Sequence, residues 1–215
     1  MPNFYLPCEP ENLDEVVGHT EAVQLLKNIA ARPKELRPHA YLFTGATGIG
    51  KSMLIKLFSK KLGCDPDWGF ELYTPAEYGR GSIYEDIVRA THYRGFSDAP
   101  YKYLYFDECH RMSPALVAKL LDPLQKPKDW IIFFLSVLQV PNNVDWRMIQ
   151  GRCVQIDLKR LNQVEIATIV TNCAKKFGKT VPDAVMDGIC VRAGGHPRDA
   201  LNRLSMVLEQ LPDLV

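Results

Sequence analysis

The sequence lacks long apolar runs, and this absence excludes the class of proteins that cross a membrane as helices. No stretch approaches the roughly 20 apolar residues that a membrane helix needs, because even residues 131–140 are interrupted by Ser136 and Gln139. The sequence also lacks an N-terminal signal peptide, close CxxC pairs among its six cysteines, internal repeats and low-complexity segments. We therefore expect a soluble protein with no membrane partner, in a reducing cytoplasm.

An excess of charge of one sign is absent as well. The 26 Lys and Arg residues are balanced by 25 Asp and Glu residues, giving a net charge of +1. No overall basic field attracts nucleic acid, so any DNA contact must come from a local patch. What is present is a 215-residue chain with 47% hydrophobic residues, enough to bury the core of one or two globular domains.

Alternating strand and helix patterns predict an α/β fold with a five-stranded parallel sheet flanked by helices. The predicted strands are residues 40–43, 70–73, 103–106, 131–138 and 154–158. The predicted helices between them are residues 21–31, 51–62, 83–91 and 114–125. From residue 162 onward the pattern changes to three helices, at residues 163–177, 182–193 and 198–211.

These patterns divide the chain into three predicted units. Residues 1–12 contain three prolines among polar positions and are predicted to form an extended arm that is not packed. Residues 13–160 form the predicted α/β core, and residues 161–215 form a small helical domain. The sheet and the helical domain together define the predicted fold.

A glycine-rich loop carries the first chemical signal. The segment Gly45-Ala-Thr-Gly-Ile-Gly-Lys-Ser52 fits G-x-x-x-x-G-K-[ST] between a predicted strand and a predicted helix. Its glycines allow backbone N–H groups to surround a phosphate chain, Lys51 supplies positive charge to the outer phosphates, and Ser52 supplies a hydroxyl to Mg²⁺. The pattern predicts ATP or GTP binding; the alternative is a glycine turn that only caps a helix.

Two adjacent acids follow a predicted strand in Tyr103-Leu-Tyr-Phe-Asp-Glu108. Asp107 lies at the strand tip, where ligands gather in α/β sheets, and is predicted to hold Mg²⁺ through water. Glu108 is predicted to orient or deprotonate the attacking water during γ-phosphate hydrolysis. The alternative is a solvated acidic turn.

The five histidines are scattered along the sequence. They are His19, His39, His92, His110 and His196. No pair has the spacing of a metal site, so we interpret them as structural or exposed residues and expect no metal beyond Mg²⁺.

Three arginines are candidates to neutralise charge that develops on the γ-phosphate, because Lys51 alone is a single cation. Arg152 precedes the last predicted strand, and Arg198 opens the last predicted helix. Arg147 is the spare candidate. Each also fits the role of a surface salt-bridge partner.

Six segments together resemble the bacterial clamp-loader tau/gamma family of AAA+ ATPases. They are Leu13-Asp-Glu-Val-Val-Gly-His19, His39-Ala-Tyr-Leu-Phe-Thr-Gly45, the glycine-rich loop, Asp107-Glu-Cys-His110, Gly151-Arg-Cys153 and Arg198-Asp-Ala-Leu201. The resemblance covers nearly the whole chain and implies an AAA+ core followed by a lid. It also implies that Asp107-Glu-Cys-His110 is a DExH form of the Walker B box.

The resemblance assigns further roles at the site. Arg152 would be an arginine finger that acts in trans on a neighbouring subunit, and Arg198 would be the sensor 2 arginine that acts in cis, beside Lys51 and Glu108. The residues expected to contact ATP are Val17, Gly45, Ala46, Thr47, Gly48, Ile49, Gly50, Lys51, Ser52 and Met53, with Ser52 and Asp107 at Mg²⁺.

The family couples ATP binding and hydrolysis to opening a sliding clamp and loading it on primer-template DNA during replication. The resemblance therefore implies an oligomer with other loader subunits in a bacterial or phage-infected bacterial cytoplasm. Clamp contact is expected from the loop at residues 91–99, with Tyr93 and Phe96, unless that loop is partly buried. Arg80 and Arg111 are expected DNA phosphate contacts, or else ordinary surface charges.

Several departures from the family pattern keep other functions open. Only Cys64 stands where the family has a four-cysteine zinc module, so no zinc is expected. Ser136 or Gln139 replaces the sensor 1 Thr or Asn, and Cys8-Glu-Pro10 replaces a Tyr-Arg-Pro motif near the adenine.

The sequence also ends at Val215, before the collar domain of the family. We therefore expect assembly through AAA+ interfaces, or a collar supplied by another chain. The alternatives are a helicase loader, a branch-migration motor or a non-hydrolysing nucleotide-binding adaptor.

Overall fold

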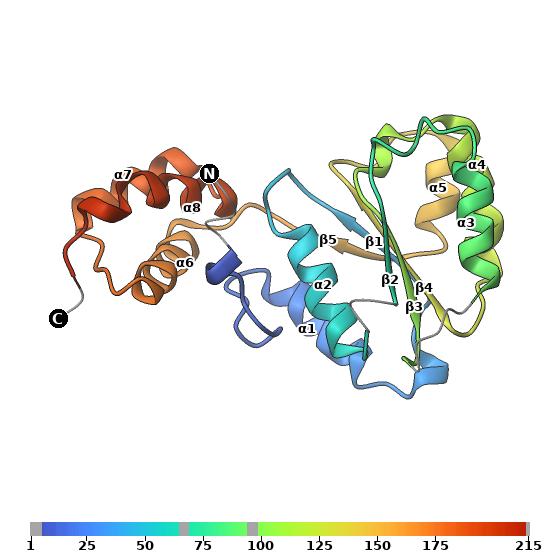
Figure 1. Cartoon of the computed structure of the whole chain (residues 1–215), viewed down its shortest axis with the longest axis horizontal. Coiled ribbons are helices and arrows are strands. Elements are labelled where there is room, and N and C mark those ends of the chain that lie inside the picture. Colours follow the sequence, from blue (N-terminus) through green and yellow to red (C-terminus); the bar gives the residue numbers. More distant parts are fainter. Residues whose placement is uncertain (1–5, 65–68, 94–98, 214–215) are drawn as a thin grey trace.

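The computed structural model describes residues 6–64, 69–93 and 99–213, and Figure 1 shows its elements. The strands are β1 (Ala40–Thr44), β2 (Phe70–Tyr73), β3 (Lys102–Phe106), β4 (Ile131–Val137) and β5 (Val154–Asp157). The α-helices are α1 (Thr20–Ala30), α2 (Lys51–Lys61), α3 (Ile83–His92), α4 (Pro114–Gln125), α5 (Val144–Gln150), α6 (Gln163–Lys176), α7 (Asp183–Ala193) and α8 (Pro197–Val207). Four short 3-10 helices are η1 (Leu6–Cys8), η2 (Lys34–Leu36), η3 (Cys109–Arg111) and η4 (Leu208–Gln210).

The five strands form one parallel sheet in the order β2-β3-β4-β1-β5. β4 is buried along its whole length between β1 and β3, as expected for a central strand covered on both faces. Because the strands are parallel, the loops that follow β1, β3 and β4 emerge at the same edge. This edge brings together the segments that carry the predicted phosphate loop and acidic pair.

Helices cover both faces of the sheet (Figure 1). α1 and α2 share one buried cluster with alternate strand residues such as Tyr41 and Phe43. α3, α4 and α5 share the other cluster with strand residues such as Leu42, as the two-residue period of a strand requires. The predicted α/β fold with its flanking helices is confirmed.

Helices α6, α7 and α8 pack around a third cluster, which contains the fully buried Ile166, Val170 and Leu204. α6 begins with a capping box, in which the Asn162 side chain accepts from the Glu165 N–H and the Glu165 carboxylate accepts from the Asn162 N–H. This three-helix unit is the lid implied by the family resemblance. The boundaries of the three units remain predictions.

Two helical details differ from the sequence predictions. Helix α5 was not predicted, because it has only seven residues and its apolar face consists mainly of the buried Trp146 and Ile149. Asn143 starts it by accepting a hydrogen bond from Trp146 N at 3.0 Å. The last predicted helix ends earlier than expected, since α8 stops at Val207 and continues only as the 3-10 turn η4.

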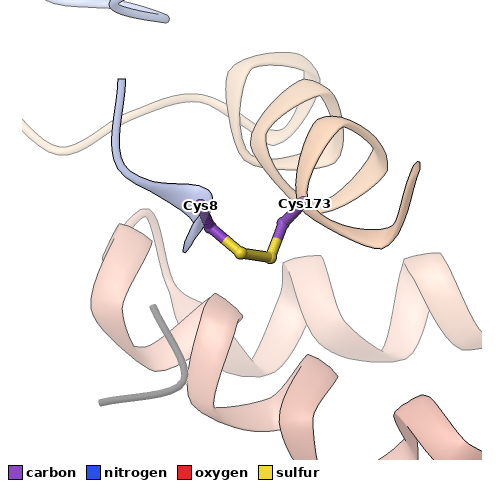
Figure 2. The surroundings of a disulfide bond; sticks show 2 residues. All are labelled: Cys8 and Cys173. Carbon is purple, nitrogen blue, oxygen red and sulfur yellow. A yellow bond between two sulfur atoms is a disulfide. The ribbon is translucent and has the colours of Figure 1, made fainter. Parts of the chain in front are cut away.

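The prediction of an extended, unpacked arm is wrong for the described residues 6–12. η1 packs on α6, and Cys8 forms a disulfide with Cys173 of that helix, with the two Cα atoms 4.9 Å apart (Figure 2). The sulfur of Cys8 thereby joins the buried cluster of the lid. Our expectation of a reducing compartment rested on the absence of close cysteine pairs, and a bond between residues 165 positions apart leaves no such local signal.

Within the described residues, none of the helices combines the length and apolarity needed to span a bilayer.

Candidate nucleotide-binding site

A cavity of about 800 Å³ opens at the carboxyl edge of the sheet, between the core and the lid. The phosphate loop and the start of α2 form one wall, and the acids after β3 lie beside them. The arm, the residues before α1 and helices α6 and α8 complete the lining. The cavity is large enough for a nucleotide, since small-molecule sites typically measure about 300–1,000 Å³.

The phosphate loop has a backbone that suits an anion. Gly48 has φ +76° and Gly50, which precedes α2, has φ +111°, in a region where side chains with a Cβ are strained. A Cβ on Gly48 would also lie 3.1 Å from the Cβ of Arg198. The loop therefore lies close to the lid, and the free N–H groups at the start of α2 give it positive potential.

Lys51 is half-buried at the start of α2 and lines the cavity. Its Nζ donates hydrogen bonds to the carbonyl oxygens of Gly45 at 2.6 Å and Ala46 at 3.0 Å. Burial lowers the pKa of Lys51, nearby Asp107 and Glu108 oppose that shift, and the charge of Arg198 adds to it. The ammonium group is thus held among the loop carbonyls at the cavity wall.

The predicted magnesium residues are brought together through a tyrosine. The Tyr105 hydroxyl lies 3.0 Å from Ser52 Oγ and donates to Asp107 Oδ1 at 2.8 Å. Ser52 and Asp107 both line the cavity, and hydroxyl and carboxylate oxygens are the ligand types that Mg²⁺ prefers. Sequence reasoning missed Tyr105, although its place on β3, two residues before Asp107, is the signal that could have found it.

Ser136 completes this network from the neighbouring strand β4. Its fully buried Oγ donates to Asp107 Oδ1 at 2.5 Å and accepts from Glu108 N at 3.1 Å. Gln139, the other candidate for the sensor 1 position, is exposed beyond the end of β4. Of the two, the structure brings only Ser136 to the acidic pair.

Glu108 lies beside the cavity in the left-handed backbone region, with φ +47°. Its N–H also donates to Asp107 Oδ1 at 3.0 Å. Glu108 Oε2 lies 3.4 Å from Nη1 of the exposed Arg111. Both predicted acids are therefore present at the site, with Glu108 in a partly exposed ion pair.

The start of α8 contacts the phosphate loop from the lid side. Arg198 N donates to Gly48 O at 3.4 Å, and His196 Nδ1 lies 3.3 Å from Thr47 O. From the opposite side, His19 Nε2 donates to Ile49 O at 3.0 Å, and burial lowers the pKa of His19. The sequence predicted both histidines to be structural or exposed residues, and the structure places both against backbone carbonyls of the phosphate loop.

The other arginine candidates lie away from this cavity. Arg152 donates through Nη1 to Met148 O at 2.6 Å and through Nη2 to Gln125 Oε1 at 2.9 Å. Arg147 donates to Asn142 Oδ1 at 2.9 Å. Neither lines the cavity, so the action of Arg152 on a neighbouring subunit remains a prediction.

The arm and α6 also contribute residues to the lining of the cavity. Cys8, Glu9, Pro10 and the predicted Val17 line it from one side. Ile169, Asn172, Lys175 and Lys176 line it from α6. The α6 residues were missed, because nothing in their spacing marks a helix face that meets an arm at the other end of the sequence, as the separation of 165 residues between Cys8 and Cys173 illustrates.

The predicted nucleotide contacts divide between the lining and the loop interior. Thr47, Gly48, Ile49, Gly50, Lys51, Ser52 and Met53 line the cavity with Val17. Gly45 and Ala46 instead accept hydrogen bonds from Lys51.

The surface residues predicted to contact clamp and DNA lie elsewhere. Tyr93 is 68% exposed at the end of α3, whereas Phe96 lies outside the described residues. Arg80 forms ion pairs with Glu77 at 3.2 Å and Asp86 at 3.6 Å. Over the described ranges, His, Cys, Asp and Glu side chains do not gather into a group of three or more that would hold a metal ion.

Known proteins resemble this chain in sequence and in structure. The chain is 30% identical over 198 residues to the replication factor C small subunit of Methanococcus vannielii, covering 91% of this chain and 61% of that protein. It is 26% identical over 231 residues to DNA polymerase III subunit tau of Bacillus subtilis, covering 99% of this chain and 40% of that protein. The chain thus spans less than two thirds of the length of these relatives.

In structure, the chain is similar to the Holliday junction branch migration motor RuvB of Thermotoga maritima, with a TM-score of 0.72, 20% identity and coverage of 95% of this chain and 67% of that chain. At this identity the similarity shows the fold alone. No protein-family model matches the sequence. The relatives in sequence, the phosphate loop and acidic pair, and the sheet with its three-helix lid agree with one another: the homologues of this chain are clamp-loader subunits, and its fold is that of AAA+ ATPases.

Proposed function

We propose that this chain is an ATP-hydrolysing subunit of a clamp-loading oligomer that acts on a sliding clamp and primer-template DNA during replication in the cytoplasm. The observation that carries the proposal is the connected arrangement of Lys51, Ser52, Asp107 and Glu108 around one cavity at the carboxyl edge of the sheet. The similarity to replication factor C and polymerase III tau sequences supports the coupling to clamp loading.

The residues present fit ATP with Mg²⁺. The phosphate chain would lie against the loop at residues 45–52, and Ser52 and Asp107 would hold the ion. When bound, Mg²⁺ supplies charge neutralisation to the phosphate oxygens. The base would lie between Val17 and the arm on one side and Ile169 of α6 on the other, where the lining is partly apolar.

In this proposal, each charged group has one task. Lys51 would leave the loop carbonyls of Gly45 and Ala46 for the outer phosphates, which are stronger acceptors because they are charged. Glu108 would orient the attacking water and accept its proton after leaving Arg111. Arg198 would add positive charge from the lid in the same subunit, and Arg152 would add it to the site of a neighbouring subunit.

The position of Arg152 supports the last assignment. Its guanidinium is held in the turn after α5 by Met148 and Gln125, on the opposite side of the sheet from α1 and α2. A cation in this position is too far from the cavity of its own chain to neutralise phosphate charge there, and its fixed guanidinium is preorganised for contact with another chain.

Steady-state ATP hydrolysis with and without primed DNA and a candidate clamp tests the proposal. We expect stimulated turnover in the unmodified chain and its loss in Lys51→Ala, Glu108→Gln and Arg152→Ala. Because a finger in trans acts on the neighbour, mixing Arg152→Ala with Lys51→Ala chains should restore part of the turnover. Nucleotide binding without turnover would favour the adaptor alternative, and stimulation by a helicase or a Holliday junction in place of a clamp would favour another AAA+ motor.

A further inference from the structure

The disulfide between Cys8 and Cys173 joins two walls of the nucleotide cavity. Cys8 itself lines the cavity, as do the next two residues, Glu9 and Pro10. On α6, Cys173 follows Asn172, which also lines the cavity. Figure 2 shows the bond crossing from the arm to α6 above the other lid helices.

The arm is fastened to the core a few residues later. Leu13 is 3% exposed in the cluster that packs α1 and α2 on the sheet. Glu11 O accepts a hydrogen bond from Lys60 Nζ at 3.1 Å, and Glu11 N donates to Glu15 at 2.9 Å. Only residues 9–12 therefore separate a point fixed in the lid from a point fixed in the core.

This short tether limits how far the lid can move. Five steps of extended chain, from Cys8 to Leu13, span at most roughly 17 Å. The peptide chain already joins the core to the start of α6 at Gln163, and Cys173 lies ten residues, or roughly 15 Å, further along that helix. With the disulfide formed, α6 is attached to the core at two separated points, and rotation about the first attachment is restricted by the second.

We propose that Cys8 and Cys173 form a reversible thiol–disulfide site that controls nucleotide exchange: the bond holds the lid over the cavity and slows nucleotide entry and release, and its reduction frees the lid. This inference rests on the proposed nucleotide-binding function. Disulfides in reducing compartments are usually transient and redox-sensing, which agrees with the expected cytoplasmic setting.

The chemistry is thiol–disulfide exchange with a small-molecule disulfide. Cys8 is partly exposed and Cys173 is buried, so the Cys8 thiolate attacks first and forms a mixed disulfide while one small thiolate leaves. The Cys173 thiolate then displaces the second small thiolate and closes the protein disulfide. The protein loses two electrons and two thiol protons, and the small disulfide is reduced to two thiols. Reduction runs through the same steps in reverse.

The test measures release of a fluorescent ATP analogue by stopped flow after chasing with excess ATP. The protein is poised with oxidised glutathione or with a reducing thiol, and peptide mass mapping reports the cross-link. Coupling between two sites commonly amounts to about fivefold or more, and we expect oxidation to slow release by at least that factor. Cys173→Ala, a change at a cysteine that does not line the cavity, should release the analogue at the rate of the reduced protein under both conditions.

Cys190→Ala is the matched control, because Cys190 is also a buried lid cysteine but lies on α7 and does not line the cavity. It should keep the full redox response. Two results overturn the inference: no cross-linked peptide of Cys8 and Cys173 under oxidation, or a quantitative cross-link with an unchanged release rate. A protein that binds no nucleotide in either state would refute the proposed function itself, which distinguishes the two failures.

Discussion

Gly195 is the position at which a single added methyl group should separate the lid from the phosphate loop. It has φ +83°, and a Cβ there would lie 2.6 Å from Leu161 O, closer than any ordinary contact with a backbone atom. Its own carbonyl accepts from Leu161 N at 3.0 Å. The neighbouring Gly194 also has a positive φ, +55°, but a Cβ on it would meet nothing within 4 Å.

This pair allows the conformational and steric effects to be measured separately. A left-handed residue with a Cβ costs about 1–2 kcal/mol, which is the whole effect expected for Gly194→Ala. Gly195→Ala adds overpacking against backbone, typically about 1–3 kcal/mol, so the sum is about 2–5 kcal/mol. Gly188→Ala is the control: this glycine is inside α7 with open space around it, and alanine there should stabilise by about 0.5–1 kcal/mol.

Urea unfolding followed by circular dichroism gives the three free-energy differences, and thermal melting should shift by about 2–4 °C per kcal/mol for a chain of this size. Binding of an ATP analogue should weaken in Gly195→Ala but not in Gly188→Ala, because Gly195 leads directly into His196 and Arg198. If Gly195→Ala destabilises no more than Gly194→Ala, the close approach to Leu161 has no energetic consequence, and this reasoning is refuted.

Three further changes test the network around the cavity. Ser136→Ala should lower the free energy of unfolding by about 1.5–3 kcal/mol, the usual contribution of a hydrogen bond to a charged group, here the Asp107 carboxylate; urea unfolding measures it. His19→Gln should flatten the pH dependence of stability. Burial lowers the pKa of His19 in the folded state below 6.5, so near that pH the unfolded state binds a proton that the folded state does not. The unmodified chain therefore loses stability as the pH falls below about 6.5. Asn162→Ala should cost about 1 kcal/mol by removing the cap of α6, seen as a lower melting temperature.

Each of these changes has a control. Ser59→Ala removes another buried hydroxyl, which donates only to the neutral Lys56 carbonyl at 2.9 Å. If Ser59→Ala lowers the free energy of unfolding as much as Ser136→Ala does, the hydrogen bond of Ser136 to Asp107 contributes nothing beyond that of an ordinary buried hydroxyl. A pH profile that keeps its slope in His19→Gln would assign the acid sensitivity to other groups. Asn162→Asp retains an acceptor at the cap of α6. If Asn162→Asp lowers the melting temperature as much as Asn162→Ala does, the cap does not account for the effect.

Much of the fold and site was predictable because the signals are local. The phosphate loop needs its glycines, Lys51 and Ser52 in one short segment, and the acids must directly follow a buried strand. Periodicity likewise located the five strands and the three lid helices. Helix α5 lacked such a signal because two turns with two buried residues are too short to show a period.

The sequence by itself determined the sheet and the segments that meet at the cavity, and its motifs predicted which residues contact phosphate, because each of these signals depends on residues close together in the chain. Only the tertiary structure decided the rest. In the structure, Ser136 and not Gln139 contacts the acidic pair, Tyr105 links Ser52 to Asp107 by hydrogen bonds, and Cys8 forms a disulfide with Cys173. These contacts join segments that are far apart in sequence. Strand order and the packing of the lid on the phosphate loop determine which residues meet, and neither can be predicted from a local sequence pattern.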